Sequence, residues 1–378
     1  MAPCDTNKDQ QEEQQYSNAV ELALSPVLPF VMKAVVELQV LDAIAEAGPG
    51  AQLSPSQIAS RLPGPAGAAT IVERNPDAPE MLDRMLRLLA SYSILTCSVV
   101  DLHSDDHDSP APALVDRRLY GLTPLAKYFV PDQDGVSITY NTVKSKSFVL
   151  SSMLVPTERG SFGRRDPFHK VHGKPAFEYL RKDPMFNEVF NKTMIDHSTM
   201  VNKKILESSY KGFEQVQKLV DVGGGLGATL NLITSKNPHI KAINFDLPHI
   251  IQQAPPYPSV EHVGGDMFES VPTGDAILMK WILHNWSDDH CLKLLKNCHK
   301  ALPDNGKIIV VEGVLPVMPD SSGATKGLFQ MDLQMMAQHF GGKERTQEEF
   351  LALATGGGFS GIKFECFVCD LWIMEFYK

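Results

Sequence analysis

Apolar residues recur every three or four positions in the first part of the chain, which is the spacing of one face of an α-helix. Residues 17–47 carry this pattern up to Gly48-Pro49-Gly50 and predict one or two amphipathic helices, preceded by a polar tail over residues 1–15. Ser54, which a proline follows, predicts an N-cap and the first turn of a short helix that ends at Pro63-Gly64.

A longer helix and a hairpin follow. Residues 78–93 predict a helix whose inner face carries Met81, Leu82, Met85, Leu88 and Leu89. Residues 94–100 and 120–123 predict two strands joined by an acidic loop over residues 103–113, and residues 124–129 predict a short helix. Helices followed by a hairpin are typical of the winged-helix plan, which many DNA-binding regulators use.

Strands and helices alternate in the second half of the chain. Residues 136–210 are mostly helical in pattern, and strands are predicted at residues 218–222, 241–245, 261–263, 276–283 and 307–311, with a final pair across 362–377. This alternation predicts a doubly wound, Rossmann-like α/β sheet that ends in an antiparallel hairpin. We expect two domains, a winged-helix-like domain over residues 1–135 and an α/β domain over residues 136–378.

The charge balance argues against a nucleic-acid surface. The chain has a formal net charge of −10, and residues 1–130 hold 9 basic and 17 acidic side chains. Binding to phosphates draws much of its affinity from clustered Lys and Arg, so a DNA-binding regulator is disfavoured. We expect the first domain instead to mediate a homodimer through apolar contacts between helices, with no nucleic-acid partner.

Cysteine usage and the N-terminus favour a protein of the cytoplasm. Six cysteines are scattered over 378 residues, which suits a reducing compartment. Cys366 and Cys369 form one CxxC, but no second pair or nearby histidine completes a zinc site. Residues 1–15 lack an apolar signal core, and no segment approaches the ~20 apolar residues of a membrane span. We therefore expect no membrane partner.

A glycine-rich turn follows the first predicted strand of the second domain. Residues 219–228 read Leu-Val-Asp-Val-Gly-Gly-Gly-Leu-Gly-Ala, and glycines at such a turn let the backbone pass close to a ligand. Gly223, Gly225 and Ala228 fit the dinucleotide pattern G-x-G-x-x-A, and Asp246 ends the next strand, where a carboxylate can bind a ribose. These residues alone leave an NAD-dependent dehydrogenase open.

Later residues favour S-adenosylmethionine over NAD. Gly227 gives the tighter G-x-G-x-G turn, which suits a ligand without a pyrophosphate. Asp266 can accept a hydrogen bond from an adenine amino group, and Met267 can pack on the ring. Lys280 is the one cation in an apolar strand and can hold a carboxylate. An adenosine at one end and a carboxylate at the other describe S-adenosylmethionine.

His284 stands where the predicted strand over residues 276–283 ends. In open α/β sheets the carboxyl ends of the strands face the crevice that binds ligands. Histidine can accept a proton near neutral pH without first being deprotonated. The position and the residue type together predict that His284 is a general base.

Six ordered blocks of sequence resemble one family. The chain resembles plant phenolic O-methyltransferases of the caffeic acid O-methyltransferase type over nearly its whole length, in residues 219–228, 244–248, 264–268, 280–291, 310–313 and 341–346. The resemblance implies transfer of a methyl group from S-adenosylmethionine to a phenolic hydroxyl of a plant specialised metabolite, such as a phenylpropanoid, an alkaloid or a flavonoid. It also implies a homodimer, formed by the N-terminal domain, which contributes to the neighbouring active site.

The resemblance further implies the roles of the site residues. His284 corresponds to the catalytic base, and Glu312 and Glu344 correspond to the glutamates that flank and orient it. The residues that correspond to ligands of the cofactor are Gly223, Asp246, Asp266, Met267 and Lys280.

The expected chemistry is consistent with these residue types. A phenol has a pKa near ~10 and is a poor nucleophile until its proton is removed, which His284 can do. One carboxylate, Glu312 or Glu344, is expected to hold the other ring nitrogen and stabilise the imidazolium. The sulfonium supplies the electrophile, so we expect no metal, and Asp288-Asp289-His290 is interpreted as the start of a helix.

An aromatic and methionine stripe predicts the acceptor pocket. Phe186, Phe190, Met194 and His197 follow one another at helical spacing, and the resemblance places them on the pocket with Leu150 and Met335. The chain departs from the caffeic acid enzymes around Lys144 and Ser145, over residues 140–165, and at two further candidate pocket residues, Asn285 and His339. The identity of the phenol therefore stays open.

Overall fold

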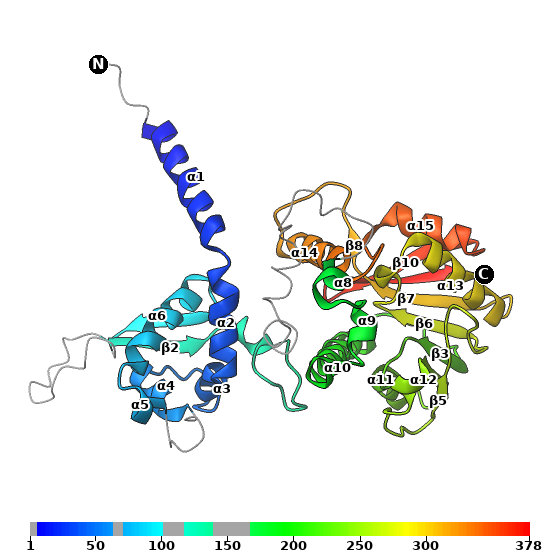
Figure 1. Ribbon diagram of the computed structural model, residues 1–378, viewed down its shortest axis with the longest axis horizontal. Coiled ribbons are helices and arrows are strands. Elements are labelled where there is room, and N and C mark those ends of the chain that lie inside the picture. Colours follow the sequence, from blue (N-terminus) through cyan, green and yellow to red (C-terminus); the bar gives the residue numbers. More distant parts are fainter. Residues whose placement is uncertain (1–5, 63–70, 101–116, 139–166) are drawn as a thin grey trace, which may run out of the picture. The chain divides into compact units, whose positions relative to one another are not determined.

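The computed structural model describes residues 6–62, 71–100, 117–138 and 167–378. The chain forms two compact units, Met1–Ser147 and Phe148–Lys378 (Figure 1). The domain boundary predicted at residue 135 stays a prediction, because the connection between the units lies in residues 139–166, outside the described ranges. The predicted residue Leu150 and the region around Lys144 lie in that range too.

Helices make up most of the first unit. They are α1 (Thr6–Leu24), α2 (Val27–Glu37), α3 (Val40–Ala45), α4 (Pro55–Arg61), α5 (Ile71–Arg74) and α6 (Ala78–Ser91). Helical structure begins earlier than the prediction at residue 17, because α1 begins at Thr6, within the polar tail. Its Gln, Glu and Lys residues have high intrinsic helix propensity, which a search for apolar periodicity does not register.

Local signals set the ends and the buried face of these helices. Ser54 caps α4, as predicted, and forms a capping box with Gln57. The face of α6 differs from the prediction: Leu82, Leu86 and Leu89 are buried in the core of the unit, whereas Met81 is 55% exposed. The apolar positions of α6 allowed either choice, and packing against α2 and α4 decides between them.

The first unit also contains the predicted hairpin. Strands β1 (Leu95–Val99) and β2 (Arg118–Leu122) pair antiparallel, and a 3₁₀ helix, η2 (Ala126–Tyr128), follows. The loop predicted over residues 103–113 lies outside the described residues. Asp83 of α6 is buried and accepts hydrogen bonds from Arg118 and the hydroxyl of Tyr120, so the helix and the hairpin are joined by a paired charge.

No single helix among the described residues is long and apolar enough to cross a membrane. Two neighbouring helical segments, Gln14–Leu24 and Val27–Glu37, meet the length and composition of a span only when taken together, and they are bent by 50° at the break.

A seven-stranded sheet forms the centre of the second unit. Its order is β10-β11-β7-β6-β3-β4-β5, and its members are β3 (Lys218–Val222), β4 (Lys241–Asp246), β5 (Val260–Gly264), β6 (Ala276–Lys280), β7 (Lys307–Glu312), β10 (Gly361–Val368) and β11 (Leu371–Tyr377). The five strands from β7 to β5 are parallel, and β10 and β11 form the predicted antiparallel hairpin at one edge.

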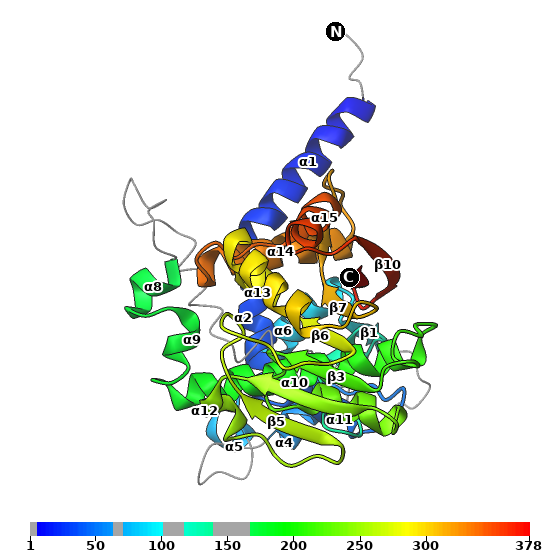
Figure 2. The same ribbon diagram turned by 90° about the vertical axis from the view of Figure 1, so that its right-hand side faces the viewer.

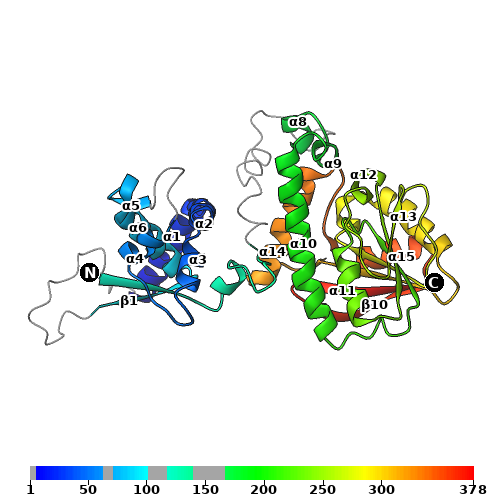
Figure 3. The ribbon, with the colours of Figure 1, turned by 90° about the horizontal axis from the view of Figure 1, so that it is seen from below.

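Helices cover both faces of this sheet. Helices α13 (Asp288–Ala301) and α15 (Gln347–Gly356) pack on one face, and α10 (Pro184–Glu207) and α11 (Ala228–Lys236) pack on the other (Figure 2, Figure 3). This is the predicted doubly wound α/β fold. Short helices α8 (Pro167–His172), α9 (Ala176–Tyr179) and α12 (Pro248–Ile251) and the longer α14 (Gly323–Gln338) complete the unit.

Candidate active site

The segment that carries His284 is not the end of a strand. The strand predicted to residue 283 stops at Lys280, because Trp281 has a positive φ of 56°, which a strand cannot contain. A 3₁₀ turn, η4 (Leu283–Asn285), follows and carries His284. The side chain of Asn285 donates to the carbonyl of Trp281 at 2.8 Å and closes the turn, so this candidate pocket residue also has a local structural bond.

One carboxylate holds the ring of His284. Nδ1 of His284 lies 2.7 Å from Oε1 of Glu344, and both side chains are buried. No hydrogen bond to Nε2 is found among the described residues, so this second nitrogen can accept a hydrogen bond from a bound substrate. A base oriented through one nitrogen and free at the other is the arrangement that general-base catalysis requires.

The second carboxylate holds the backbone instead. Oε1 of Glu312 accepts the amide N–H groups of Ile282 and Leu283, at 2.9 and 2.6 Å. Of the two glutamates that the sequence leaves open, Glu344 therefore bonds to the ring and Glu312 fixes the turn that presents it. Oε2 of each glutamate is buried with no hydrogen-bond partner among the described residues.

The acidic surroundings change the protonation of His284. Burial lowers the pKa of His284, but the hydrogen bond to Glu344 and the charges of Glu312 and Glu344 offset this, so the net shift is upward. Burial also raises the pKa of Glu312. The imidazolium form of His284 is therefore stabilised, which suits a side chain that takes up a proton.

A small parallel pairing brings Glu344 to His284. Strand β8 (Val314–Leu315) directly follows the turn after β7, and it pairs with β9 (Arg345–Thr346), which directly follows Glu344. The amide of Lys343 also donates to the carbonyl of His284 at 2.9 Å. Two-residue strands have no periodicity, so this pairing is invisible in the sequence.

Arg345 lies beside the candidate base, and the sequence pattern did not single it out. Its side chain is fully buried and donates to the carbonyls of Leu283 and Trp286, both at 2.8 Å, and to Asp288 at 2.8 and 3.0 Å. It therefore ties the turn around His284 to the segment that carries Glu344. Its one sequence signal was its place in the matching block over residues 341–346.

The glycine turn lies beside the base. Gly223 and Gly225 have positive φ angles of 72° and 58°, which favour glycine. A Cβ atom on Gly223 would lie 2.4 Å from Cδ1 of Ile282, so the two loops touch, whereas one on Gly225 would meet nothing within 4 Å. The backbone of Gly225 is therefore open to a ligand, and its N–H donates to Oδ2 of Asp246 at 2.9 Å.

Neighbouring strand ends supply the other predicted cofactor residues. The carboxyl ends of β6, β3, β4 and β5 lie at one edge of the sheet because these strands are parallel neighbours. Asp246 ends β4, Lys280 ends β6, and Asp266 and Met267 follow β5. An open glycine turn, a carboxylate at the next strand end and a cation two strands from it fit the ribose and the carboxylate of S-adenosylmethionine.

Lys280 contacts His197, one of the residues predicted to line the acceptor pocket. Its Nζ lies 3.1 Å from Nδ1 of His197 and 4.1 Å from the centroid of the Trp281 ring. The His197 and Trp281 rings stack with centroids 3.8 Å apart. Burial, and then the charge of Lys280, lower the pKa of His197 well below its ordinary value. The ring of His197 is therefore neutral, and its Nδ1 can accept a hydrogen bond from Lys280.

The other predicted pocket residues divide into two groups. Phe190 lies 6.4 Å from Phe177, whose ring stacks on Trp286 at 6.0 Å and lies 4.8 Å from the ring of His339. Phe186 instead packs on Tyr179 and Phe168, at 5.5 and 6.1 Å between centroids. Met194 is half-buried on α10, and Met335 is buried on α14. Burial lowers the pKa of His339 to about 3, so this ring is neutral.

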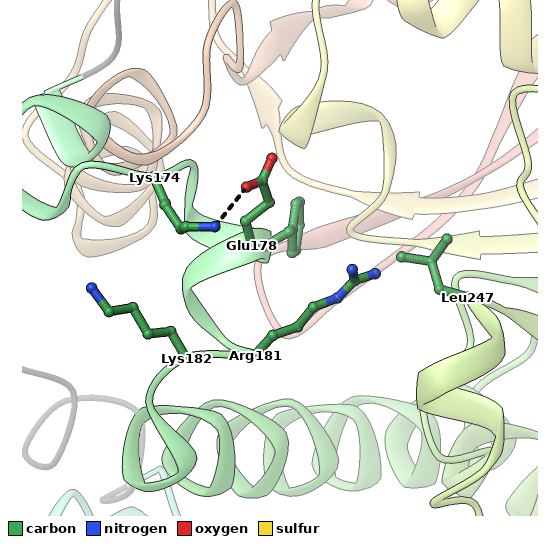
Figure 4. A pocket seen from close by; sticks show the side chains of 6 residues that line it. Lys174, Glu178, Arg181, Lys182 and Leu247 are labelled. Atoms are coloured by element: carbon green, nitrogen blue, oxygen red, sulfur yellow. Dashed lines mark ion pairs between the residues drawn. The ribbon is translucent and has the colours of Figure 1, made fainter.

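Phe177 was missed by the sequence pattern, since a four-residue helix is too short to show periodicity. It also lines a cavity of about 520 Å³ whose other walls are Lys174, Glu178, Arg181, Lys182 and Leu247 (Figure 4). Leu247 directly follows Asp246, so the cavity lies between α9 and the end of β4. Phe177 therefore contacts both this cavity and the rings of Phe190, Trp286 and His339.

One cluster among the described residues has the composition of a metal site. The ligand atoms of His284, Glu312 and Glu344 lie within 4.8 Å of one another. However, Nδ1 of His284 and Oε1 of Glu344 are hydrogen-bonded to each other, and Oε1 of Glu312 accepts hydrogen bonds from two backbone amides.

The predicted helix start at Asp288 is confirmed, with Asp288 and Asp289 in the first turn of α13.

Two family models match the chain. The O-methyltransferase domain matches residues 157–360, and the O-methyltransferase dimerisation domain matches residues 20–132.

Similar proteins are methyltransferases. Caffeic acid 3-O-methyltransferase of Medicago sativa is 55% identical over 360 residues, which are 95% of this chain and 93% of the relative. Catechol O-methyltransferase 1 of Solanum lycopersicum is 50% identical, over 98% of this chain and 97% of the relative. The crystal structure of human N-acetylserotonin methyltransferase in complex with SAM superposes with a TM-score of 0.73 at 19% identity, over 97% of this chain and 98% of that one.

Proposed function

We propose, from the premise that this chain belongs to the O-methyltransferase family, that it methylates a phenolic hydroxyl with His284 as the general base. Membership confirms the predicted reaction class, O-methyl transfer, and the predicted donor, S-adenosylmethionine. It also decides against the dehydrogenase that the glycine turn had left open.

The bond between His284 and Glu344 carries the proposed mechanism. Bound S-adenosylmethionine supplies an electrophilic methyl group on a sulfonium. Nε2 of His284 takes the phenolic proton as the oxygen forms its bond to the methyl carbon and the carbon–sulfur bond breaks, so that S-adenosylhomocysteine would leave; the resulting imidazolium donates from Nδ1 to Glu344 over 2.7 Å. Glu312 keeps the ring in place by holding the amides of Ile282 and Leu283. General bases of this kind contribute about 10²–10⁴-fold.

The reaction proposed here requires no metal. The leaving group is a neutral thioether, so no Lewis acid is needed to stabilise it, and His284 and Glu344 are already engaged with each other. We expect turnover to be unchanged after dialysis against EDTA. A loss of activity that Zn²⁺ or Mg²⁺ restores would assign the cluster of His284, Glu312 and Glu344 to a metal instead.

The acceptor class follows from the relatives and the rings. Relatives at 50–55% identity are caffeic acid and catechol O-methyltransferases, and Phe190, His197 and His339 offer neutral aromatic faces to a flat phenol. We propose a catechol-like phenol from plant specialised metabolism, with Met194, Met335 and Asn285 as further neighbours. Leu150 belongs to the same proposal by resemblance alone.

A homodimer is the proposed assembly. The dimerisation-domain match covers residues 20–132, and α1 and α2 expose large apolar side chains, which include Leu22 at 74%, Leu24 at 62% and Phe30 at 54%. Apolar surface of this kind marks contacts between proteins.

The test separates binding from chemistry. His284→Ala should bind S-adenosylhomocysteine as the wild type does in titration calorimetry, yet lose turnover by at least about 100-fold. His299→Ala, on α13, is the matched control. Retention of most activity by His284→Ala would place the base elsewhere. A labelled-methyl screen with caffeic acid, simple catechols, flavonoids and tetrahydroisoquinoline alkaloids then identifies the acceptor.

A further inference from the structure

A chain of hydrogen bonds runs from the loop before β5 to the glycine turn. Nε2 of His262, on β5, lies 2.9 Å from the carbonyl of Pro255, and Nδ1 of the same ring lies 3.0 Å from Nδ2 of Asn244. Nδ2 of Asn244, on β4, also donates to the carbonyl of Gly225 at 2.9 Å. Three hydrogen bonds through two side chains, those of His262 and Asn244, thus connect Pro255 to Gly225.

The donor and acceptor roles along this chain are fixed. An amide nitrogen only donates, so Nδ1 of His262 must accept and carries no proton. Nε2 of His262 must then carry the proton, which it donates to the carbonyl of Pro255. Exchanging the oxygen and nitrogen of Asn244 would place Oδ1 against the carbonyl oxygen of Gly225, so the amide orientation is fixed as well. His262 has one permitted neutral tautomer.

Both polar groups of Gly225 depend on side chains from β4. The carbonyl of Gly225 accepts from Asn244, and its N–H donates to Asp246, at 2.9 Å in each case. His262 also limits the turn sterically, since a Cβ atom on Gly227 would lie 3.0 Å from Cε1 of His262. The conformation of the turn therefore rests on a pair of side chains, of which only Asp246 was predicted.

We propose that His262 is a positioning residue for the cofactor: by accepting from Asn244 it fixes the amide that holds Gly225 in its binding conformation. This inference rests on the proposed cofactor site at the glycine turn. Among the described residues, no contact is found between His262 and the base or a predicted acceptor residue, so its loss weakens cofactor binding and leaves the chemical step unaffected.

Two substitutions separate the two bonds of the ring. His262→Asn keeps an oxygen near the position of Nδ1, which can accept from Asn244, and loses the bond to Pro255. His262→Gln keeps a donor near the position of Nε2 and loses the acceptor for Asn244. We expect the dissociation constant of S-adenosylhomocysteine to rise about tenfold in His262→Gln and less than about threefold in His262→Asn.

The measurements are calorimetric titration with S-adenosylhomocysteine, steady-state kinetics and the thermal midpoint of the ligand-free protein. The KM for S-adenosylmethionine should rise in His262→Gln with kcat within about twofold of the wild type, whereas a purely structural role would lower the thermal midpoint of both variants equally. His239→Gln, an exposed histidine before β4, is the matched control. The Asn244→Ala background should abolish the difference between the two His262 variants.

Equal cofactor affinity in wild type, His262→Asn and His262→Gln would overturn the proposal, and so would a fall in kcat without a change in affinity. Failure of the wild-type protein itself to bind S-adenosylhomocysteine would instead contradict the proposed cofactor site. The two failures are therefore distinguishable.

Discussion

Two opposing effects set the protonation of His284. Burial disfavours the charged ring, and the neighbouring carboxylates Glu344 and Glu312 favour it more strongly, which raises the pKa above the ordinary value of 6.5. A base must be neutral before it reacts. Under the proposed mechanism, the raised pKa shifts the neutral, active form of His284 to higher pH and makes the imidazolium formed by proton uptake more stable.

This balance predicts the pH dependence of turnover. In the wild type the acid limb of kcat/KM should lie above pH 6.5, the ordinary histidine pKa, and activity should rise with pH through it. Glu344→Gln removes the charge and weakens the hydrogen bond, so the limb should move to lower pH while kcat falls by about 100-fold. Glu348→Gln, an exposed acid on α15, should change neither. A limb that stays in place in Glu344→Gln would show that another group titrates.

A second prediction concerns Gly224. A Cβ atom there would lie 2.2 Å from Oδ1 of Asn244 and 2.7 Å from Oδ2 of Asp221, both of which belong to buried side chains. Overpacking of this kind costs about 1–3 kcal/mol, so Gly224→Ala should bind S-adenosylhomocysteine at least about tenfold more weakly. Gly361→Ala, which meets nothing within 4 Å, should bind it normally. Calorimetry distinguishes the two, and equal affinities would mean that the turn adapts.

At the scale of elements, the apolar pattern predicted the longer strands of the sheet well, but it did not predict the short, irregular segments. The sheet strands β3, β4 and β7 lie within one residue of their predicted ends, because apolar runs between glycine and proline signals leave little choice. The break at Trp281 and the β8–β9 pairing were not predicted. The turn after Trp281 is held by Glu312, and β8 pairs with a strand that begins at Arg345, so both features depend on residues that are distant in sequence.

The same reason limits how far the candidate site could be predicted. The place of His284 after a predicted strand indicated a base, and the resemblance to the family indicated Glu312 and Glu344, but neither could decide which glutamate bonds to the ring. That choice depends on where β8 and β9 place Glu344. Phe177 and Asn244 were not predicted as site residues, since one lies on a single-turn helix and the other is a buried amide in a strand.

The third prediction concerns Arg345, which links the turn around His284 to the segment that carries Glu344. Arg345→Met removes the donors to the buried carbonyls of Leu283 and Trp286, and unpaired buried polar groups are costly. We expect the free energy of unfolding to fall by about 3 kcal/mol, and kcat to fall because the turn that carries His284 loosens. Lys343→Met removes a half-exposed partner of the same Asp288 and should cost under about 1 kcal/mol. Urea unfolding measures the free energy of unfolding of both variants. Equal losses would mean that Arg345 stabilises the turn no more than Lys343 does.

At the scale of the whole molecule, the two units have separate hydrophobic cores. One core lies among α2, α3, α4 and α6, and the others lie on the two faces of the seven-stranded sheet. The proposed association through α1 and α2 and the proposed cofactor site at the sheet edge therefore depend on different sets of packed side chains. Association and cofactor binding should respond independently to substitution.

The fourth prediction tests this independence. Leu22→Glu combined with Leu24→Glu places two charges at exposed apolar positions of α1 and should convert the proposed dimer to monomers, as measured by light scattering after size-exclusion chromatography. S-adenosylhomocysteine affinity should stay within about twofold. Val99→Glu, at an equally exposed apolar position on β1, is the control and should remain dimeric. A double variant that also remains dimeric would locate the contact elsewhere.

Helix α10 joins two regions that should tolerate substitution differently. Its C-terminal half places Val201 and Ile205 in the buried core beneath the sheet, whereas Phe186, Phe190 and Met194 in its N-terminal half are only half-buried. Substitutions in the N-terminal half can therefore alter the proposed acceptor surface at little cost to folding, while those in the C-terminal half remove core packing. Under the proposed function, a change of phenol thus needs only a few substitutions in one helix, with the turn that carries His284 and the sheet left unchanged.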